Sequence, residues 1–179
     1  VPNTLKHWNS VLDINAQVIA IPVDKNGILD HEFIRKHAAN ALMICTMAVN
    51  NETGVFQDLS AIEQVIRSEN THVAWMVDCV QALGKTNLAL SQTTIDYAPF
   101  SGHKLYAPKG IGVLYIRKGS AYTPFIAGGG QESGMRSGTE NLPGIAGLNK
   151  LFTLLLDKQN QTFKPIEQLH AFREQLLAA

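Results

Sequence analysis

Cysteine is scarce in this chain, which has only Cys45 and Cys79 among its 179 residues. The two lie far apart, and neither belongs to a CxxC pair or to a paired histidine spacing. The sequence therefore indicates neither a disulfide framework nor a zinc site. Single cysteines of this kind usually act as small core residues, and we expect both in that role.

An excess of charge of either sign is also lacking, because 15 Lys and Arg balance 15 Asp and Glu. Such a chain has no long-range field for phosphate backbones or anionic lipids, so we expect no nucleic-acid partner. No apolar run reaches the roughly 18 residues of a membrane-spanning helix. The first residues also lack a basic segment leading into an apolar one. We therefore expect a cytoplasmic protein without a membrane partner.

The chain does have the composition of a globular protein, with 45% hydrophobic and 17% charged residues. Its length suits one large domain or part of a larger one. Helical and β-rich stretches alternate, which predicts an α/β fold with a mainly parallel sheet flanked by helices. Strands are expected at 17–23, 41–49, 72–78, 96–100 and 112–116, with 41–49 apolar on both faces like a central strand.

Helices are expected between these strands. An amphipathic helix carries Leu5 and Trp8, and Asp30 caps a second, short helix. Ser60 and Glu63 form the capping box of a third helix. Helical segments continue from Leu142 to the end, with a break at the polar stretch 157–162.

Polar residues follow several of the predicted strands. In open parallel sheets, ligands bind beyond the carboxyl ends of the strands, so these residues are candidates for a site. They are Asn50–Glu52, Asp78 with Gln81, the segment 101–104, and the glycine-rich stretch 128–139. Singly, each has an ordinary explanation, such as a turn cap for Asp78 or a solvated loop position for Lys104. Their joint placement at one sheet edge favours a binding site.

The residue types at this edge suit one particular chemistry. A partly desolvated lysine such as Lys104 becomes a nucleophilic amine that forms imines. A carboxylate such as Asp78 can keep a heterocyclic nitrogen protonated, and Ser101 and His103 can donate to a phosphate. Pyridoxal 5'-phosphate requires all three, because its protonated ring is the electron sink for charge at the substrate α-carbon.

Four phrases, VNNETG, VDCVQALGK, SGHKLYAPKGIG and GGGQESGMRSGTEN, follow one another in this order. Together they resemble the cysteine desulfurase branch of the class V aminotransferases, over about Gln17 to Leu148. The resemblance implies the fold-type I architecture of pyridoxal-phosphate enzymes. It also implies conversion of L-cysteine to L-alanine plus enzyme-bound persulfide sulfur, for iron–sulfur cluster assembly or other sulfur delivery. A homodimer and a sulfur-acceptor protein are the implied partners.

The resemblance also implies roles for individual residues around the ring of the cofactor. Lys104 is the catalytic lysine that binds the cofactor covalently. Asp78 pairs with the pyridinium nitrogen, while Gln81 and Asn51 contact the side of the ring that carries the phenolic oxygen.

Phosphate contacts are implied in the same way. Ser101 and His103 bind the phosphate within the subunit, and Thr139 reaches the phosphate of a neighbouring subunit. Arg136 lies in the same segment as Thr139, but the resemblance assigns it no firm role.

Members of this family are considerably longer than the chain. We expect residues 1–150 to be part of the pyridoxal-phosphate-binding large domain, and 151–179 to be a helical segment leading toward a small domain. The remaining phosphate loop and a ring-stacking histidine are expected before Val1, and the persulfide-forming cysteine after Ala179. Ala107 stands where the family usually has glycine. The chain by itself is expected to lack desulfurase activity.

Three alternatives stay open. The segment Gly84–Thr86 matches the end of a nucleotide-binding phosphate loop, but Cys79 occupies the position of its first glycine. Another class V lyase or aminotransferase, such as a selenocysteine lyase, would use the same lysine and aspartate. A catalytically silent scaffold would keep the fold without binding the cofactor, and would be colourless where a loaded enzyme is yellow.

Overall fold

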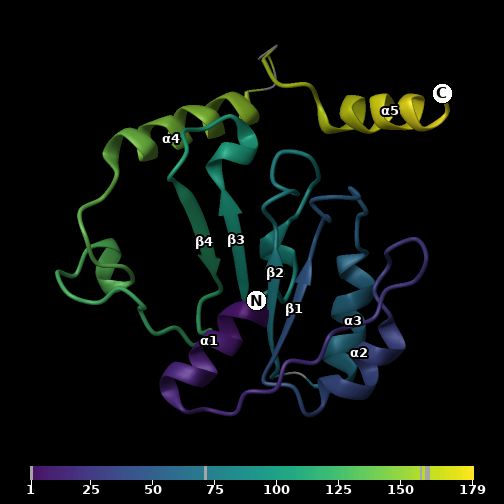
Figure 1. Cartoon of the computed structure of the whole chain (residues 1–179). Helices are drawn as coiled ribbons and strands as arrows, with labels where there is room; N and C mark the ends of the chain where they lie inside the picture. The colour runs from purple at the N-terminus through teal and green to yellow at the C-terminus, as the bar shows by residue number, and fades with distance from the viewer. Residues whose placement is uncertain (1, 71, 158, 160–161) are drawn as a thin grey trace.

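The strands form one four-stranded sheet with helices around it (Figure 1). The computed structural model describes residues 2–70, 72–157, 159 and 162–179. The order across the sheet is β1 (Met43–Met47), β2 (Ala74–Asp78), β3 (Tyr97–Ser101) and β4 (Gly112–Ile116). β1, β2 and β3 are parallel, and β4 is antiparallel to β3. The predicted class, a mainly parallel sheet flanked by helices, is confirmed.

The helices occupy the connections and the two ends of the chain. They are α1 (Pro2–Leu12), α2 (His31–Ala38), α3 (Leu59–Glu69), α4 (Leu142–Leu156), α5 (Ile166–Leu177) and the 3₁₀ turns η1 (Leu90–Gln92), η2 (Gly102–Leu105) and η3 (Glu132–Gly134). α4 crosses the end of the sheet at which β3 finishes and β4 begins (Figure 1). In the described part of the chain, none of these helices has the length and apolar character needed to cross a lipid bilayer.

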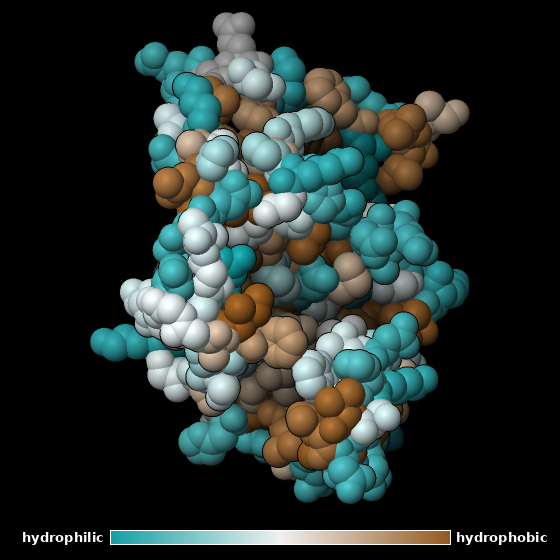
Figure 2. Space-filling model, turned by 60° about the vertical axis from the view of Figure 1, so that its left-hand side comes forward, coloured by the Kyte–Doolittle hydropathy of each residue, from teal (hydrophilic) through white to brown (hydrophobic). Residues whose placement is uncertain are grey.

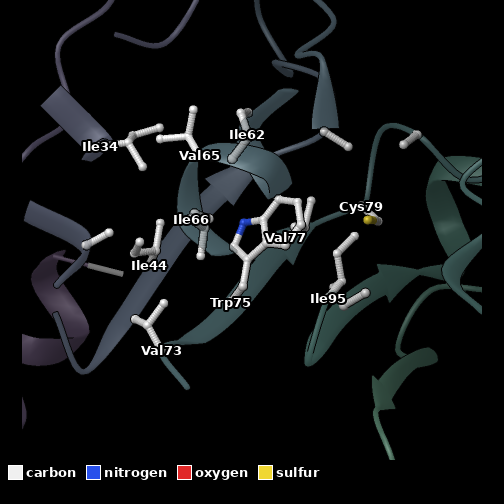
Figure 3. Close-up of a cluster of buried hydrophobic side chains, with 14 of the residues drawn as sticks. Ile34, Ile44, Ile62, Val65, Ile66, Val73, Trp75, Val77, Cys79 and Ile95 are labelled. Atoms are coloured by element: carbon white, nitrogen blue, oxygen red, sulfur yellow. The ribbon is translucent and has the colours of Figure 1, made fainter. Parts of the chain in front are cut away.

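The main core lies between the sheet and the pair α2 and α3. Trp75 on β2 is fully buried and lies among Ile34 of α2 and Ile62 and Ile66 of α3 (Figure 3). Its indole Nε1 donates to Thr46 Oγ1 on β1 at 3.1 Å, so the largest core side chain keeps its polar atom paired. This core holds β1 and β2 in place and thereby fixes where their carboxyl ends lie.

A second, smaller core lies under α4. Leu148 and Leu151 of α4 pack with the buried Leu105, which ends η2. Close backbone approaches tighten this contact: a Cβ at Gly147 would stand 2.7 Å from Pro108 Cδ, and one at Gly144 would stand 3.1 Å from Ile111 Cβ. The 3₁₀ turn after β3 therefore rests on α4.

The prediction of a strand at 17–23 is wrong. In the structure this segment makes only an isolated antiparallel bridge between Val23 and Leu29. Val18 and Ile19 are 42% and 57% exposed. A β-favouring sequence forms a strand only where a neighbouring strand supplies hydrogen-bond partners, and none lies beside this segment in the described chain.

Two further expectations are corrected. The run 41–49 was expected in the centre of the sheet, but β1 pairs only with β2 and is an edge strand of the described sheet. Helix α3 is capped by Asp58, whose carboxylate accepts from Ala61 N, and not by Ser60. Glu63 instead accepts from Thr94 N at 2.6 Å. The helix begins at Leu59, one residue before Ser60, because the carboxylate of Asp58 satisfies the free amide of the third helical residue, Ala61.

The other predicted elements are confirmed with small shifts of their ends. Asp30 caps α2 by accepting from Phe33 N at 2.9 Å. α4 ends at Leu156 and α5 begins at Ile166, so the helix breaks in the expected region. Residues 158, 160 and 161 of the predicted break lie outside the described residues.

Candidate active site

The parallel register brings two candidate residues to one face of the sheet. Met76 pairs with Tyr97, so Asp78 and Ser101, two and four residues further on, lie on the same side of their strands. This face is opposite to the one on which Trp75 and Cys79 are buried. The carboxyl ends of β2 and β3 thus present a carboxylate and a hydroxyl side by side.

One carboxylate oxygen of Asp78 accepts a hydrogen bond from the protein, and the other does not. Its Oδ1 accepts from Val80 N at 3.0 Å, which closes the turn after β2. The ordinary explanation, a turn cap, therefore accounts for one oxygen only. Oδ2 accepts no hydrogen bond from any residue that the structure describes, and the side chain is half-buried. The carboxylate is held in place and keeps one acceptor free for a ligand.

Ser101, His103 and Lys104 lie together at the end of β3. Ser101 Oγ and His103 Nδ1 are 2.8 Å apart, so the serine hydroxyl can orient the imidazole ring. Lys104 follows within η2, and its side chain is exposed between the buried Gly102 and Leu105. The buried neighbours hold the turn on α4 while the lysine stays accessible.

The turn after β1 separates the roles of two adjacent asparagines. Asn50 Oδ1 accepts from the amides of Glu52 and Thr53, both at 2.9 Å, and so shapes the turn. Asn51 is exposed at the tip. Asn50 is thus committed to the fold, whereas Asn51 is free to contact a ligand.

Asn51 and Gln81 line a single cavity of about 370 Å³, together with Lys85 and, from α5, Arg173. The turn after β1 and the segment after β2 form its walls. Asp78, Ser101, His103 and Lys104 do not line this cavity but follow the same edge of the sheet. The structure thus brings six of the seven predicted site residues to one sheet edge.

The structure adds Lys85 to the candidate residues of this cavity, whereas the sequence analysis considered it only as part of a nucleotide-binding phosphate loop. Its Nζ donates to Gln81 Oε1 at 2.8 Å. Burial lowers the pKa of Lys85, and the positive charge of Lys104 lowers it further. The four-residue spacing of Gln81 and Lys85 was the available signal, because residues at this spacing face one another on a helical turn.

Thr139 lies apart from the other predicted site residues. It is exposed in the loop between β4 and α4, and the preceding η3 lies on the far side of β4 from β1 and β2 (Figure 1). Arg136 Nη1 donates to Gly138 O at 3.1 Å within the same loop. The structure does not bring Thr139 to Lys104 within one subunit.

Neither cysteine resembles a reactive thiol. Cys79 is fully buried, and burial, with the adjacent Asp78 charge, raises its pKa to about 12. Burial also raises the pKa of Cys45, a half-buried residue of β1. Among the described residues, no three His, Cys, Asp or Glu side chains are grouped as metal ligands.

The nucleotide-binding alternative finds no phosphate cradle in the structure. The amides of Leu83 and Thr86 donate to the carbonyls of Cys79 and Ala82, at 3.2 and 3.0 Å. Amides that are already paired in this way cannot surround a phosphate, and the lysine of the motif is engaged by Gln81.

The comparisons of this chain with known proteins agree on one family. The family model for aminotransferase class-V matches residues 4–178. The cysteine desulfurase IscS of Rickettsia bellii is 39% identical over 156 residues, which cover 86% of this chain and 38% of that protein. The corresponding protein of Rickettsia prowazekii is 45% identical over 135 residues, or 74% of this chain and 32% of that protein. The chain thus spans well under half the length of these curated relatives.

Solved structures agree. A NifS-like protein superimposes with a TM-score of 0.80 at 36% identity, over 87% of this chain and 42% of that one. A structure described as SspA in complex with cysteine gives a TM-score of 0.75 at 31% identity, over 86% of this chain and 44% of that one.

Proposed function

Since the chain belongs to the aminotransferase class-V family, we propose that the protein carrying it is a pyridoxal-phosphate-dependent cysteine desulfurase that acts on L-cysteine. One observation of the structure carries this proposal. Lys104 and the free oxygen of Asp78 lie at the carboxyl ends of adjacent parallel strands, beside further polar donors. The names of the relatives, cysteine desulfurases at 39% and 45% identity, support the choice of substrate.

The residues present fit the cofactor by the chemistry of their donors and acceptors. Asp78 Oδ2 is an unengaged acceptor suited to a protonated ring nitrogen. Asn51 and Gln81 offer amide donors from one cavity to an oxygen on the ring. Ser101 and His103 are 2.8 Å apart and share one hydrogen in their mutual bond, so the neutral pair offers one donor to a phosphate, either the serine hydroxyl or the ring Nε2–H.

In this proposal, the bound cofactor supplies an electron sink for the charge that develops at the substrate α-carbon. Lys104 Nζ would hold the cofactor, and its free amine would serve as the base for the proton on the substrate α-carbon. Asp78 holds the proton on the ring nitrogen throughout. Cys45 and Cys79 are poor candidates for the acceptor of the substrate sulfur, because burial raises the pKa of both thiols and so lowers the fraction present as the reactive thiolate.

We further propose a homodimer, in which Thr139 contacts the phosphate bound by the other subunit. The exposure of Thr139, and the place of the preceding η3 on the far side of β4 from β1 and β2, support this role. Figure 2 shows several brown apolar patches on the side of the molecule that η3 and β4 occupy in Figure 1. Exposed apolar residues here include Leu114 of β4, which is 47% exposed, and Phe125 in the loop between β4 and η3, which is 77% exposed. Exposed apolar surface of this kind favours self-association.

The lysine assignment is tested by chemical trapping. The chain is incubated with pyridoxal phosphate, reduced with borohydride and mapped by peptide mass spectrometry. We expect the label on Lys104, and we expect Lys104→Met to abolish it while Lys109→Met, a matched change in the neighbouring loop, leaves it intact. A label on Lys85 or Lys109, or one spread over many lysines, would contradict the assignment.

The reaction is tested in the protein that carries this chain. Alanine and sulfide formed from L-cysteine, and abolished by Lys104→Ala, would support the desulfurase. Turnover of selenocysteine alone would favour a selenocysteine lyase. A colourless protein that neither binds the cofactor nor turns over would favour the silent scaffold.

A further inference from the structure

The contact between Lys85 and Gln81 is built into the backbone. Leu83 N donates to Cys79 O and Thr86 N donates to Ala82 O, so the segment after β2 has helical hydrogen bonding. The segment is a series of turns and not a continuous helix, because Gly84 has φ +73° and Lys85 N donates to Ala82 O. These turns bring the side chains of Gln81 and Lys85 together. Lys85 Nζ accordingly reaches Gln81 Oε1 at 2.8 Å.

Gly84 brings this segment against the turn that carries Lys104. Its φ is +73°, a conformation that favours glycine, and a Cβ there would stand 2.9 Å from Leu105 Cδ2. Lys85 is therefore held beside the Lys104 turn and is half-buried. Its ammonium group donates to Gln81 Oε1, and its side chain lines the cavity that Asn51 also lines.

The chemistry of lysine determines how the Gln81 amide is turned. An ammonium group has three donors and no acceptor, so the atom that faces it must be the amide oxygen. The Gln81 NH₂ group is then directed away from Lys85. Gln81 and Asn51 line the same cavity. An acceptor atom bound there would need an amide N–H group facing it and not an amide oxygen.

We propose that Lys85 is a positioning residue, which holds the Gln81 oxygen so that the Gln81 NH₂ group faces the cofactor ring. This inference rests on the function proposed above. The phenolic oxygen of the cofactor is an acceptor when ionised, so a Gln81 amide turned the other way would oppose one oxygen to another. Lys85 removes that alternative by binding the Gln81 oxygen itself, and it does so without touching the ring.

The test uses Lys85→Met, which keeps much of the length of the side chain but removes its donor. Lys85→Arg keeps a donor, and Lys109→Met is a matched lysine-to-methionine control on an exposed loop. The first readout needs no cofactor: the ¹³C resonance of the Gln81 side-chain carbonyl, assigned by its loss in Gln81→Ala. We expect the chemical shift of this resonance to move toward that of a solvated glutamine in Lys85→Met. It should stay unchanged in Lys85→Arg and Lys109→Met.

The second readout is the dissociation constant for pyridoxal phosphate, from an absorbance titration. Loss of a charge-assisted hydrogen bond predicts roughly tenfold weaker binding in Lys85→Met. Lys85→Arg should recover most of the affinity. In the Gln81→Ala background, Lys85→Met should cause no further loss, because Lys85 acts through Gln81.

The outcomes separate this inference from the proposed function. If the wild-type protein binds the cofactor but Lys85→Met leaves the Gln81 carbonyl resonance unchanged, the role of Lys85 is overturned and the function stands. The same conclusion follows if the losses of affinity in Lys85→Met and Gln81→Ala add together in the double variant. A protein that carries the wild-type chain and shows the Lys85–Gln81 contact but binds no cofactor, even in excess, would contradict the function and the role together.

Discussion

The protonation state of Cys79 follows from its burial, and it shows how one position affects stability. The thiol is fully buried in the main core, and its pKa is raised from 9.0 to about 12, first by burial and then by Asp78. The folded protein therefore keeps the thiol proton at pH values where the unfolded chain loses it. This group stabilises the fold fully below about pH 9 and loses that contribution as the pH rises toward 12.

We expect wild type to lose stability relative to Cys79→Ala as the pH rises from 8 to 10.5. The loss should be about 2 kcal/mol, because one pKa unit corresponds to about 1.4 kcal/mol. Urea unfolding of both proteins across this range measures it, and the comparison cancels the titration of lysines and tyrosines. Parallel pH profiles for the two proteins would show that the folded thiol titrates normally.

At the scale of an element, the turn η2 positions Lys104 because there is little room around Gly102. Its amide donates to Ile111 O at 3.0 Å, and its carbonyl accepts from Ala107 N at 3.1 Å. A Cβ at this position would stand 3.1 Å from Ala107 Cβ and from Ile111 O. The turn is thus closed on both sides, and any side chain added there must displace it.

Gly102→Ala should destabilise the fold by about 1–3 kcal/mol, the usual cost of overpacking. It should also weaken trapping of the cofactor on Lys104, because the turn shifts. The double variant Gly102→Ala/Ala107→Gly removes one of the two close neighbours and should recover part of the stability. Denaturant unfolding gives the first quantity and borohydride labelling the second. A neutral Gly102→Ala would mean that the turn has room to adjust.

Across the whole molecule, the two ends of the sheet carry different groups of polar side chains. The carboxyl ends of β1, β2 and β3 carry the candidate site, whereas the opposite end carries a polar network around Asp96. Its Oδ2 accepts from Trp75 N at 2.8 Å and lies 3.5 Å from Arg67 Nη2 of α3. Its Oδ1 accepts from Ser120 Oγ at 2.9 Å. One carboxylate thereby joins β2, α3 and the turn after β4, away from the candidate active site.

Asp96→Ala should lower the free energy of unfolding by about 3 kcal/mol, because it leaves a largely buried guanidinium and a strand amide without this partner. The same change should leave borohydride labelling of Lys104 unaltered under conditions where the protein is folded. Thermal and denaturant unfolding measure the first effect, and Ser120→Ala, which removes only one of the contacts, should cost less. Loss of labelling in a folded Asp96→Ala variant would mean that the two ends of the sheet are coupled.

The sequence by itself determined the elements whose signals are local. The apolar runs of β2 and β4, the Asp30 cap of α2 and the polar residues that follow β1, β2 and β3 are short-range patterns, and the structure contains them. Asn51, Gln81 and Lys104 were selected from such patterns, and their roles at the cofactor remain predictions.

Tertiary structure decided what depends on distant neighbours. The segment 17–23 has the composition of a strand but forms none, because strand formation needs hydrogen bonds from another part of the chain. The edge position of β1 depends in the same way on which strands lie beside it. The lowered pKa of Lys85 depends on burial and on Lys104, which follows it by a whole strand and turn. Local sequence specifies a side chain and its backbone preference, but burial, charge proximity and strand pairing exist only once the chain has folded.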